Sequence, residues 1–191
     1  MARPRSTSDD DFVQAAATAA VRRGDGSWSL ADVARVVGVT PAALVKRFGS
    51  KRGLLLAVVG AWVRDLPEYA ADPAVDPLAH VRAWAVDWLA AAADPDTAVG
   101  HLTLVLDEVV DPEARALLAE GRRRQAGYLH AALGDAHERG LLRTAPSLGA
   151  TQLWLDLLAG VALASAIERS GQAASRALAF IDHDIERWRT P

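Results

Sequence analysis

Apolar residues recur every three or four positions along most of the chain, and we find no segment with the strict alternation typical of a half-buried strand. This spacing predicts an all-α protein. Breaks rich in Gly, Pro and Asp separate the predicted helices. The predicted helices cover residues 8–24, 29–38, 40–49, 50–66, 77–93, 96–110, 112–139, 145–170 and 173–189.

Helix start signals are dense in the first third of the chain. Ser29 with Asp32 three residues on forms a capping pattern, and we expect Asp32 and Arg35 to face outward from the helix that follows. Thr40 followed by Pro41 pairs an N-cap hydroxyl with a proline at the first helical position. Short, well-delimited helices are therefore predicted here.

A tight turn, "GVT" at residues 38–40, joins the second and third predicted helices, as in a DNA-binding helix-turn-helix. On a helical wheel, Leu44 and Phe48 point toward the preceding helix. Ala42, Ala43 and Lys46 point away from that core. The third helix therefore presents small side chains and one cation on its outer face.

The charge distribution along the chain supports a polyanionic partner. Residues 1–65 carry ten Lys or Arg against six Asp or Glu, whereas residues 66–191 carry eleven against eighteen. A basic end on an acidic body indicates that one end meets a polyanion.

Small residues let a helix backbone approach base edges in the major groove, and Lys46 can donate to guanine or to a phosphate. Arg47, Lys51 and the N–H groups at helix starts suit phosphate oxygens, while Arg3 and Arg5 on an N-terminal arm suit a minor groove or the DNA backbone. The candidate DNA-binding residues are Arg5, Ser29, Thr40, Pro41, Ala42, Ala43, Val45, Lys46, Arg47 and Lys51.

Residues 9–60 resemble the N-terminal DNA-binding domain of the tetracycline-repressor (TetR/AcrR) family. The matching positions are Phe12, Leu30, Val33, Ala34, Gly38, Val39, Thr40, Leu44, Phe48, Ser50, Lys51, Leu54 and Leu55. The resemblance implies a three-helix DNA-binding domain at residues 1–49, a connecting helix at 50–66, and a helical domain for ligand binding and dimerisation at 67–191. It also implies a homodimer on a palindromic double-stranded operator, most often as a repressor that a small ligand releases.

One position departs from the family pattern. The family usually carries aromatic residues between the positions of Leu44 and Phe48, often a Tyr that touches a phosphate, where this chain has Val45. Valine cannot make that hydrogen bond, and we expect Arg47 to replace the contact from the other flank of the helix.

A helix that is apolar nearly all round must be buried on more than one side, and only Asp156 and Ser165 interrupt residues 153–167. We expect the second side to face another subunit, with the last helix completing a four-helix interface. The alternative is a monomer with both helices in one core. The candidate dimerisation residues are Leu157, Gly160, Val161, Ala164, Ala177, Ile181 and Ile185.

Bulky amphipathic side chains are frequent in the middle helices. The family resemblance implies a partly apolar effector pocket there, whereas the spacing alone fits ordinary core residues equally well. The candidate effector-binding residues are Trp62, Trp84, Trp88, His101, Tyr128 and Trp154.

Other function classes find little support. The chain has no cysteine and none of the common catalytic or phosphate-binding motifs. Asp182, His183 and Asp184 are consecutive, so their side chains diverge on a helix and cannot easily hold one metal ion. We expect no enzyme, metal or cofactor, although a protein-binding scaffold and, less strongly, a small all-α enzyme remain alternatives. With no apolar run of about 18 residues and no signal peptide, we expect a cytoplasmic protein that does not meet a membrane.

Overall fold

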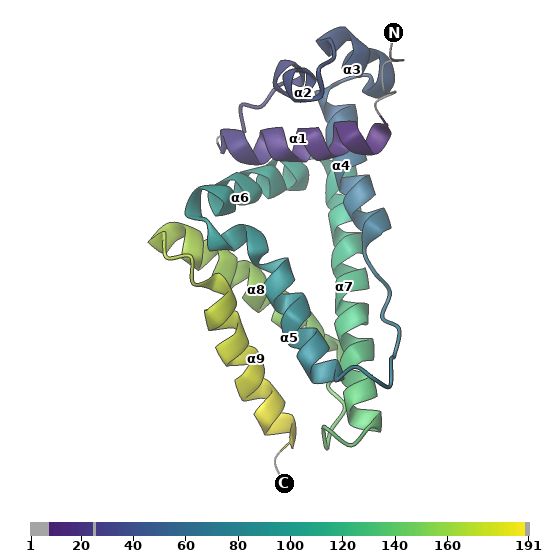
Figure 1. The fold of residues 1–191 in the computed structure, drawn as a ribbon, viewed down its shortest axis with the longest axis vertical. Helices are drawn as coiled ribbons and strands as arrows, with labels where there is room; N and C mark the ends of the chain where they lie inside the picture. The colour runs from purple at the N-terminus through teal and green to yellow at the C-terminus, as the bar shows by residue number, and fades with distance from the viewer. Residues whose placement is uncertain (1–7, 25, 190–191) are drawn as a thin grey trace. The chain divides into compact units, whose positions relative to one another are not determined.

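The computed structural model describes residues 8–24 and 26–189. Within them it has nine α-helices, one short 3₁₀ helix and no strand, so the all-α prediction is confirmed (Figure 1). The elements are α1 (Asp9–Arg23), α2 (Leu30–Val37), α3 (Pro41–Phe48), α4 (Lys51–Asp65), α5 (Pro77–Trp88), η1 (Ala90–Ala93), α6 (Pro95–Val110), α7 (Pro112–Glu138), α8 (Leu148–Glu168) and α9 (Ala173–Arg189).

The polar caps set the early helix boundaries as the sequence predicts. Ser29 and Asp32 form a reciprocal capping box at the start of α2, and the Thr40 side chain accepts from the Ala43 N–H at the start of α3. Later boundaries differ from prediction. The predicted helix 77–93 is α5 followed by η1, and α8 begins at Leu148 because Ser147 caps it.

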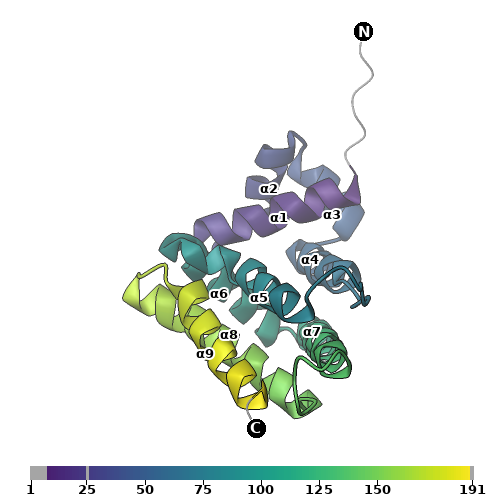
Figure 2. The same cartoon turned by 60° about the horizontal axis from the view of Figure 1, so that its bottom comes forward.

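The chain divides into two compact units. Unit 1 comprises the described part of residues 1–65 together with residues 99–119. Its core forms where α1 packs against α2 and α4, and Figure 2 shows α1 lying beside α2 and α3. The largest core side chains include Phe12, Trp28, Leu44, Leu54 and Leu104. This core fixes the rotation of α3.

Unit 2 comprises residues 66–98 and the described part of 120–191. Here α9 packs against both α5 and α8 (Figure 1). Its fully buried side chains include Leu78, Leu89, Leu129, Leu133, Trp154, Leu155, Leu158, Ile181 and Ile185.

Helix α8 is unusually apolar for its exposure. It is the one helix among the described residues that is long and apolar enough, by length and composition, to cross a membrane, and 33% of its apolar window is buried within the chain. The side chains of Leu153, Leu163 and Ile167 are exposed, Ile167 by 74%. An apolar face left open in this way is typical of a surface that another molecule covers.

Candidate DNA-binding site

The turn between α2 and α3 has helix-turn-helix geometry. Gly38 ends α2 with φ +75°, a left-handed conformation that glycine adopts without steric cost. The N–H of Val39 then donates to the carbonyl oxygen of Ala34 at 3.0 Å. Thr40 and Pro41 begin α3 directly afterwards, so the turn between the two helices is only three residues long.

Two apolar side chains anchor α3 to the rest of unit 1. Leu44 is fully buried, and Phe48 meets Phe12 of α1 edge-on, with ring centroids 5.9 Å apart and an interplanar angle of 79°. Both anchors lie on the predicted side of the helix. The opposite side is therefore left to solvent.

That outer face carries the predicted side chains. Ala42, Ala43 and Lys46 are all exposed, and Val45 is 46% exposed. Val36 of the neighbouring α2 is an apolar residue that is 55% exposed, and it is not among the residues singled out from the sequence. Its place off the buried stripe of α2, which includes Val33 and Ala34, is the signal that would have identified it. The face combines small or apolar contacts with a single ammonium group.

Arg47 is held by other residues of the chain. Its Nε donates to Oδ1 of Asp9 at the start of α1, and its guanidinium lies 5.3 Å from the centroid of the Phe12 ring. The Asp9 carboxylate also raises the pKa of Arg47 above its usual value. A phosphate contact from Arg47 would require it to leave Asp9.

Lys51 also has intramolecular partners. Its Nζ donates to the carbonyl oxygen of Gly26 at 3.2 Å and lies 4.4 Å from the centroid of the Trp28 ring. These contacts join the first residue of α4 to the segment between α1 and α2. Lys46 is thus the candidate base-reading cation for which no intramolecular hydrogen bond or ion pair is found among the described residues.

The prediction that Asp32 faces outward is wrong. Its side chain is buried, with the whole residue 8% exposed, because Arg23 donates to it at 2.7 Å and Arg35 at 3.1 Å, in addition to the capping bonds from Ser29. The hydrogen bond from Arg23, followed by that from Ser29, holds the pKa of Asp32 well below its usual range. This buried carboxylate links α1 to α2. The candidate contact Arg5, like Arg3, lies outside the described residues.

Comparison with known proteins agrees with this geometry. Residues 12–58 match the family model described as bacterial regulatory proteins, tetR family. Over these residues the chain is therefore similar to the tetR family of regulatory proteins. It is a helix-turn-helix protein of the DNA-binding, transcription-regulating type. No curated protein matches the chain.

Solved structures share the fold of this chain. A TetR transcription regulator from Haloarcula marismortui superposes with a TM-score of 0.76 at 15% identity, covering 94% of this chain and 97% of that one. A TetR-family transcriptional regulator from Agrobacterium tumefaciens gives a TM-score of 0.68 at 22% identity, covering 95% and 97%.

The predicted effector residues do not form one cluster among the described residues. Trp62 and His101 belong to unit 1, and the other four belong to unit 2. Trp154 is a core residue: its ring stacks on Trp188 at 5.3 Å and its Nε1 donates to Asp184 at 2.9 Å. Trp88 is half-buried and has no ring contact among the described residues.

Trp84 and Tyr128 do come together, with ring centroids 6.1 Å apart. Tyr69 and His80, which sequence reasoning missed, complete this aromatic group: the Tyr69 ring lies 5.7 Å from both His80 and Tyr128, and the His80 Nε2 hydrogen-bonds the Tyr128 hydroxyl. A groove of about 230 Å³ adjoins the group. It is lined by Pro67, Glu68, Tyr69, Arg124, Gly127, Tyr128 and Ala131.

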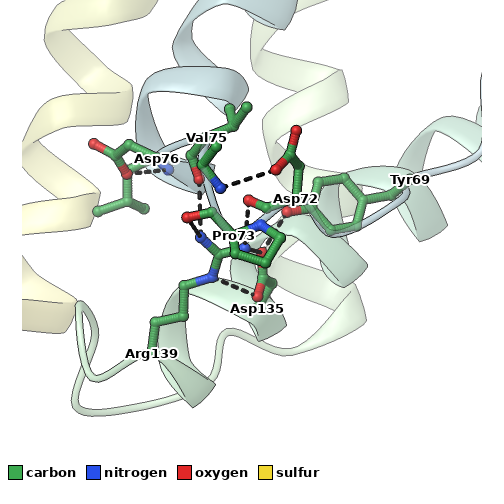
Figure 3. A network of polar contacts seen from close by, with 9 residues as sticks. Tyr69, Asp72, Pro73, Val75, Asp76, Asp135 and Arg139 are labelled. Atoms are coloured by element: carbon green, nitrogen blue, oxygen red, sulfur yellow. Dashed lines mark hydrogen bonds and ion pairs between the residues drawn. The ribbon is translucent and has the colours of Figure 1, made fainter.

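Arg139 connects the loop of residues 66–76 to α7 through hydrogen bonds and an ion pair (Figure 3). Its guanidinium donates to the carbonyl oxygens of Asp72 at 2.8 Å and Val75 at 2.9 Å, and forms a two-pronged ion pair with Asp135 at 2.8 Å. Asp135 also accepts from the Tyr69 hydroxyl at 2.6 Å. Burial and this bond raise the pKa of Tyr69 to about 12, so the hydroxyl stays a donor at neutral pH.

The two helices predicted to form the dimer interface differ in exposure. Ala177, Ile181 and Ile185 of α9 are buried within the single chain, and the prediction that they face a partner is corrected: they pack inside unit 2, where α9 meets α5 and α8. The α8 candidates remain accessible: Gly160 is exposed and the others are half-buried. These others are Leu157, Val161 and Ala164.

Proposed function

We propose that this chain is a dimeric, sequence-specific regulator of the tetR family that represses transcription and leaves its operator when a small ligand binds. The observation that carries the proposal is the outer face of α3, where Ala42, Ala43 and Lys46 project from a short helix anchored by buried side chains.

In this proposal α3 enters the major groove. The alanine side chains permit close approach to base edges and offer methyl groups to thymine, while Lys46 donates to guanine O6 and N7. The N–H groups at the starts of α3 and α4, beside Thr40 and Ser50, face phosphates. Val45 supplies an apolar contact in place of a hydrogen bond.

A two-fold dimer would present two such helices to half-sites about one helical turn apart. The exposed apolar face of α8 is the surface we assign to the partner, with Gly160 and Ala164 allowing close helix crossing. Because α9 buries its stripe inside unit 2, α8 contributes the larger share of this interface.

The effector would be a small, partly apolar molecule that contacts Trp84 and Tyr128. It must bind more tightly to the conformation that does not bind DNA, because equal affinity for both conformations would leave the equilibrium between them unchanged. A regulator of this kind acts on DNA and performs no catalysis, and we place it in the cytoplasm.

Selection of bound duplexes from a pool of random DNA tests the proposal. We expect a palindromic consensus for the unmodified protein. Lys46→Ala should weaken binding to the selected duplex by about 1–3 kcal/mol and relax the choice of base at one position in each half-site. Arg123→Ala, which removes a charge from an exposed ion pair on α7, is the control. Recovery of no enriched sequence would contradict sequence-specific binding.

A further inference from the structure

Arg47, a cation on the proposed DNA-binding helix α3, already forms an ion pair with Asp9. Arg47 lies in the last turn of α3, and Asp9 is the first residue of α1. The two side chains hydrogen-bond directly, and Phe12 supports the guanidinium from one face. An arginine that would otherwise face solvent beside the outer face of α3 is thus already bound to an anion.

Asp9 is not needed to cap α1. The N-cap Ser8 forms a complete capping box with Asp11: the Ser8 side chain accepts from the Asp11 N–H at 3.1 Å, and Asp11 accepts from the Ser8 N–H at 2.8 Å. Asp9 stands outside that exchange of bonds. Its described hydrogen bond goes to Arg47 instead.

The pair is also easy to open. The side chains of Arg47 and Asp9 are 43% and 63% exposed, and ion pairs at such exposure contribute little to stability. A DNA phosphate offers the same guanidinium a geometry suited to two parallel hydrogen bonds. Carboxylate and phosphate therefore compete for one cation at modest cost.

We propose that the Asp9 carboxylate acts as an intramolecular substitute for a DNA phosphate at Arg47, so that DNA must displace Asp9 and the affinity is held below its attainable value. This inference rests on the proposed DNA-binding function. Asp9 would then serve to set the affinity for DNA, since Ser8 and Asp11 cap α1 without it.

Asp10 provides a matched control. It lies next to Asp9 in the first turn of α1, and it pairs with Arg64 of α4 at 3.3 Å, where Arg64 keeps Asp65 as a second partner. Asp9→Asn and Asp10→Asn remove the same charge from the same helix end. Only Asp9→Asn releases Arg47.

The experiment measures the affinity of each variant for a random-sequence duplex over a series of salt concentrations. Asp9→Asn should bind about two- to fivefold more tightly than Asp10→Asn at low salt. Its plot of log affinity against log salt should keep a similar slope, because Arg47 contacts the same phosphate in both variants and only the internal competitor is lost.

A double variant separates the arginine from the general loss of negative charge. In the Arg47→Ala background, Asp9→Asn should give no gain over Asp10→Asn. Equal affinities of the two single variants, or a gain that persists without Arg47, would overturn the inference. If the unmodified protein bound no DNA at low salt, the proposed function itself would fail, and the two failures are thereby distinguished.

Discussion

Gly100 of α6 lies directly against the main-chain carbonyl of Val21 in α1: a Cβ at position 100 would stand 1.9 Å from that oxygen. One turn further along α6, the Thr103 hydroxyl donates to the carbonyl oxygen of Gly24 at 2.9 Å. Within unit 1, α6 therefore rests on the end of the first helix through backbone contact that no other residue type allows.

Gly100→Ala should destabilise the protein by about 1–3 kcal/mol, because the added methyl group must push α1 and α6 apart. The control is Gly134→Ala in α7, where a Cβ would meet nothing within 4 Å. That substitution should stabilise the helix by about 0.5–1 kcal/mol. Thermal unfolding of both variants should show a lower stability for Gly100→Ala and a higher one for Gly134→Ala. A stabilised Gly100→Ala protein would contradict the close packing of α6 on α1.

Glu108 predicts a pH-dependent stability. Burial raises the pKa of this carboxyl to about 7, from an ordinary value of 4.5. Between these two values the folded protein keeps a proton that the unfolded chain loses, so this group lowers stability as the pH rises from about 4.5 to 7.

Glu108→Gln should remove this fall in stability with rising pH, because glutamine does not ionise. Its free energy of unfolding should exceed that of the unmodified protein by at most about 3 kcal/mol at pH 8, with little difference at pH 4.5. Urea unfolding at the two pH values measures the effect. If the variant were more stable than the unmodified protein by the same amount at both pH values, the gain would come from packing rather than from ionisation.

Arg139→Ala should loosen the loop of residues 66–76. The substitution removes donors to the Asp72 and Val75 carbonyls and leaves Asp135 without its ion-pair partner. Hydrogen–deuterium exchange of this loop should become several-fold faster. Arg123→Ala in α7 should leave the exchange of this loop unchanged, and the same exchange rate in both variants would show that Arg139 does not hold the loop.

The exposed face of α8 predicts the dimer contact. Leu163→Glu should place a charge in the proposed interface and shift the protein toward monomer, as should Gly160→Leu by blocking close approach. Val86→Glu, at an exposed valine of α5, should leave the association state as it was. Sedimentation velocity resolves the species, and an intact Leu163→Glu dimer would locate the interface elsewhere.

Local features of the site could be predicted because their causes are close in sequence. Ser29, Thr40 and Gly38 set the ends of α2 and α3 through residues three or four positions away. The rotation of α3 also follows from its own spacing, since Leu44 and Phe48 must share the buried side.

Partners from distant segments could not be predicted. Asp32 has the spacing of an exposed capping residue, and only Arg23, arriving from α1, accounts for its burial. The bond between Arg47 and Asp9 joins residues 38 positions apart. Likewise, the stripe of Ile181 and Ile185 predicts a buried face, but periodicity does not say whether the same chain or a second copy covers it.

The most direct test of DNA binding by α3 is the affinity of the protein for a duplex, measured by fluorescence anisotropy as salt increases from about 50 to 200 mM. We expect measurable binding at the lowest salt and a linear fall of log affinity with log salt, with Lys46→Ala binding more weakly than the unmodified protein throughout. Absence of binding at the lowest salt, or affinity unaffected by Lys46→Ala, would contradict it.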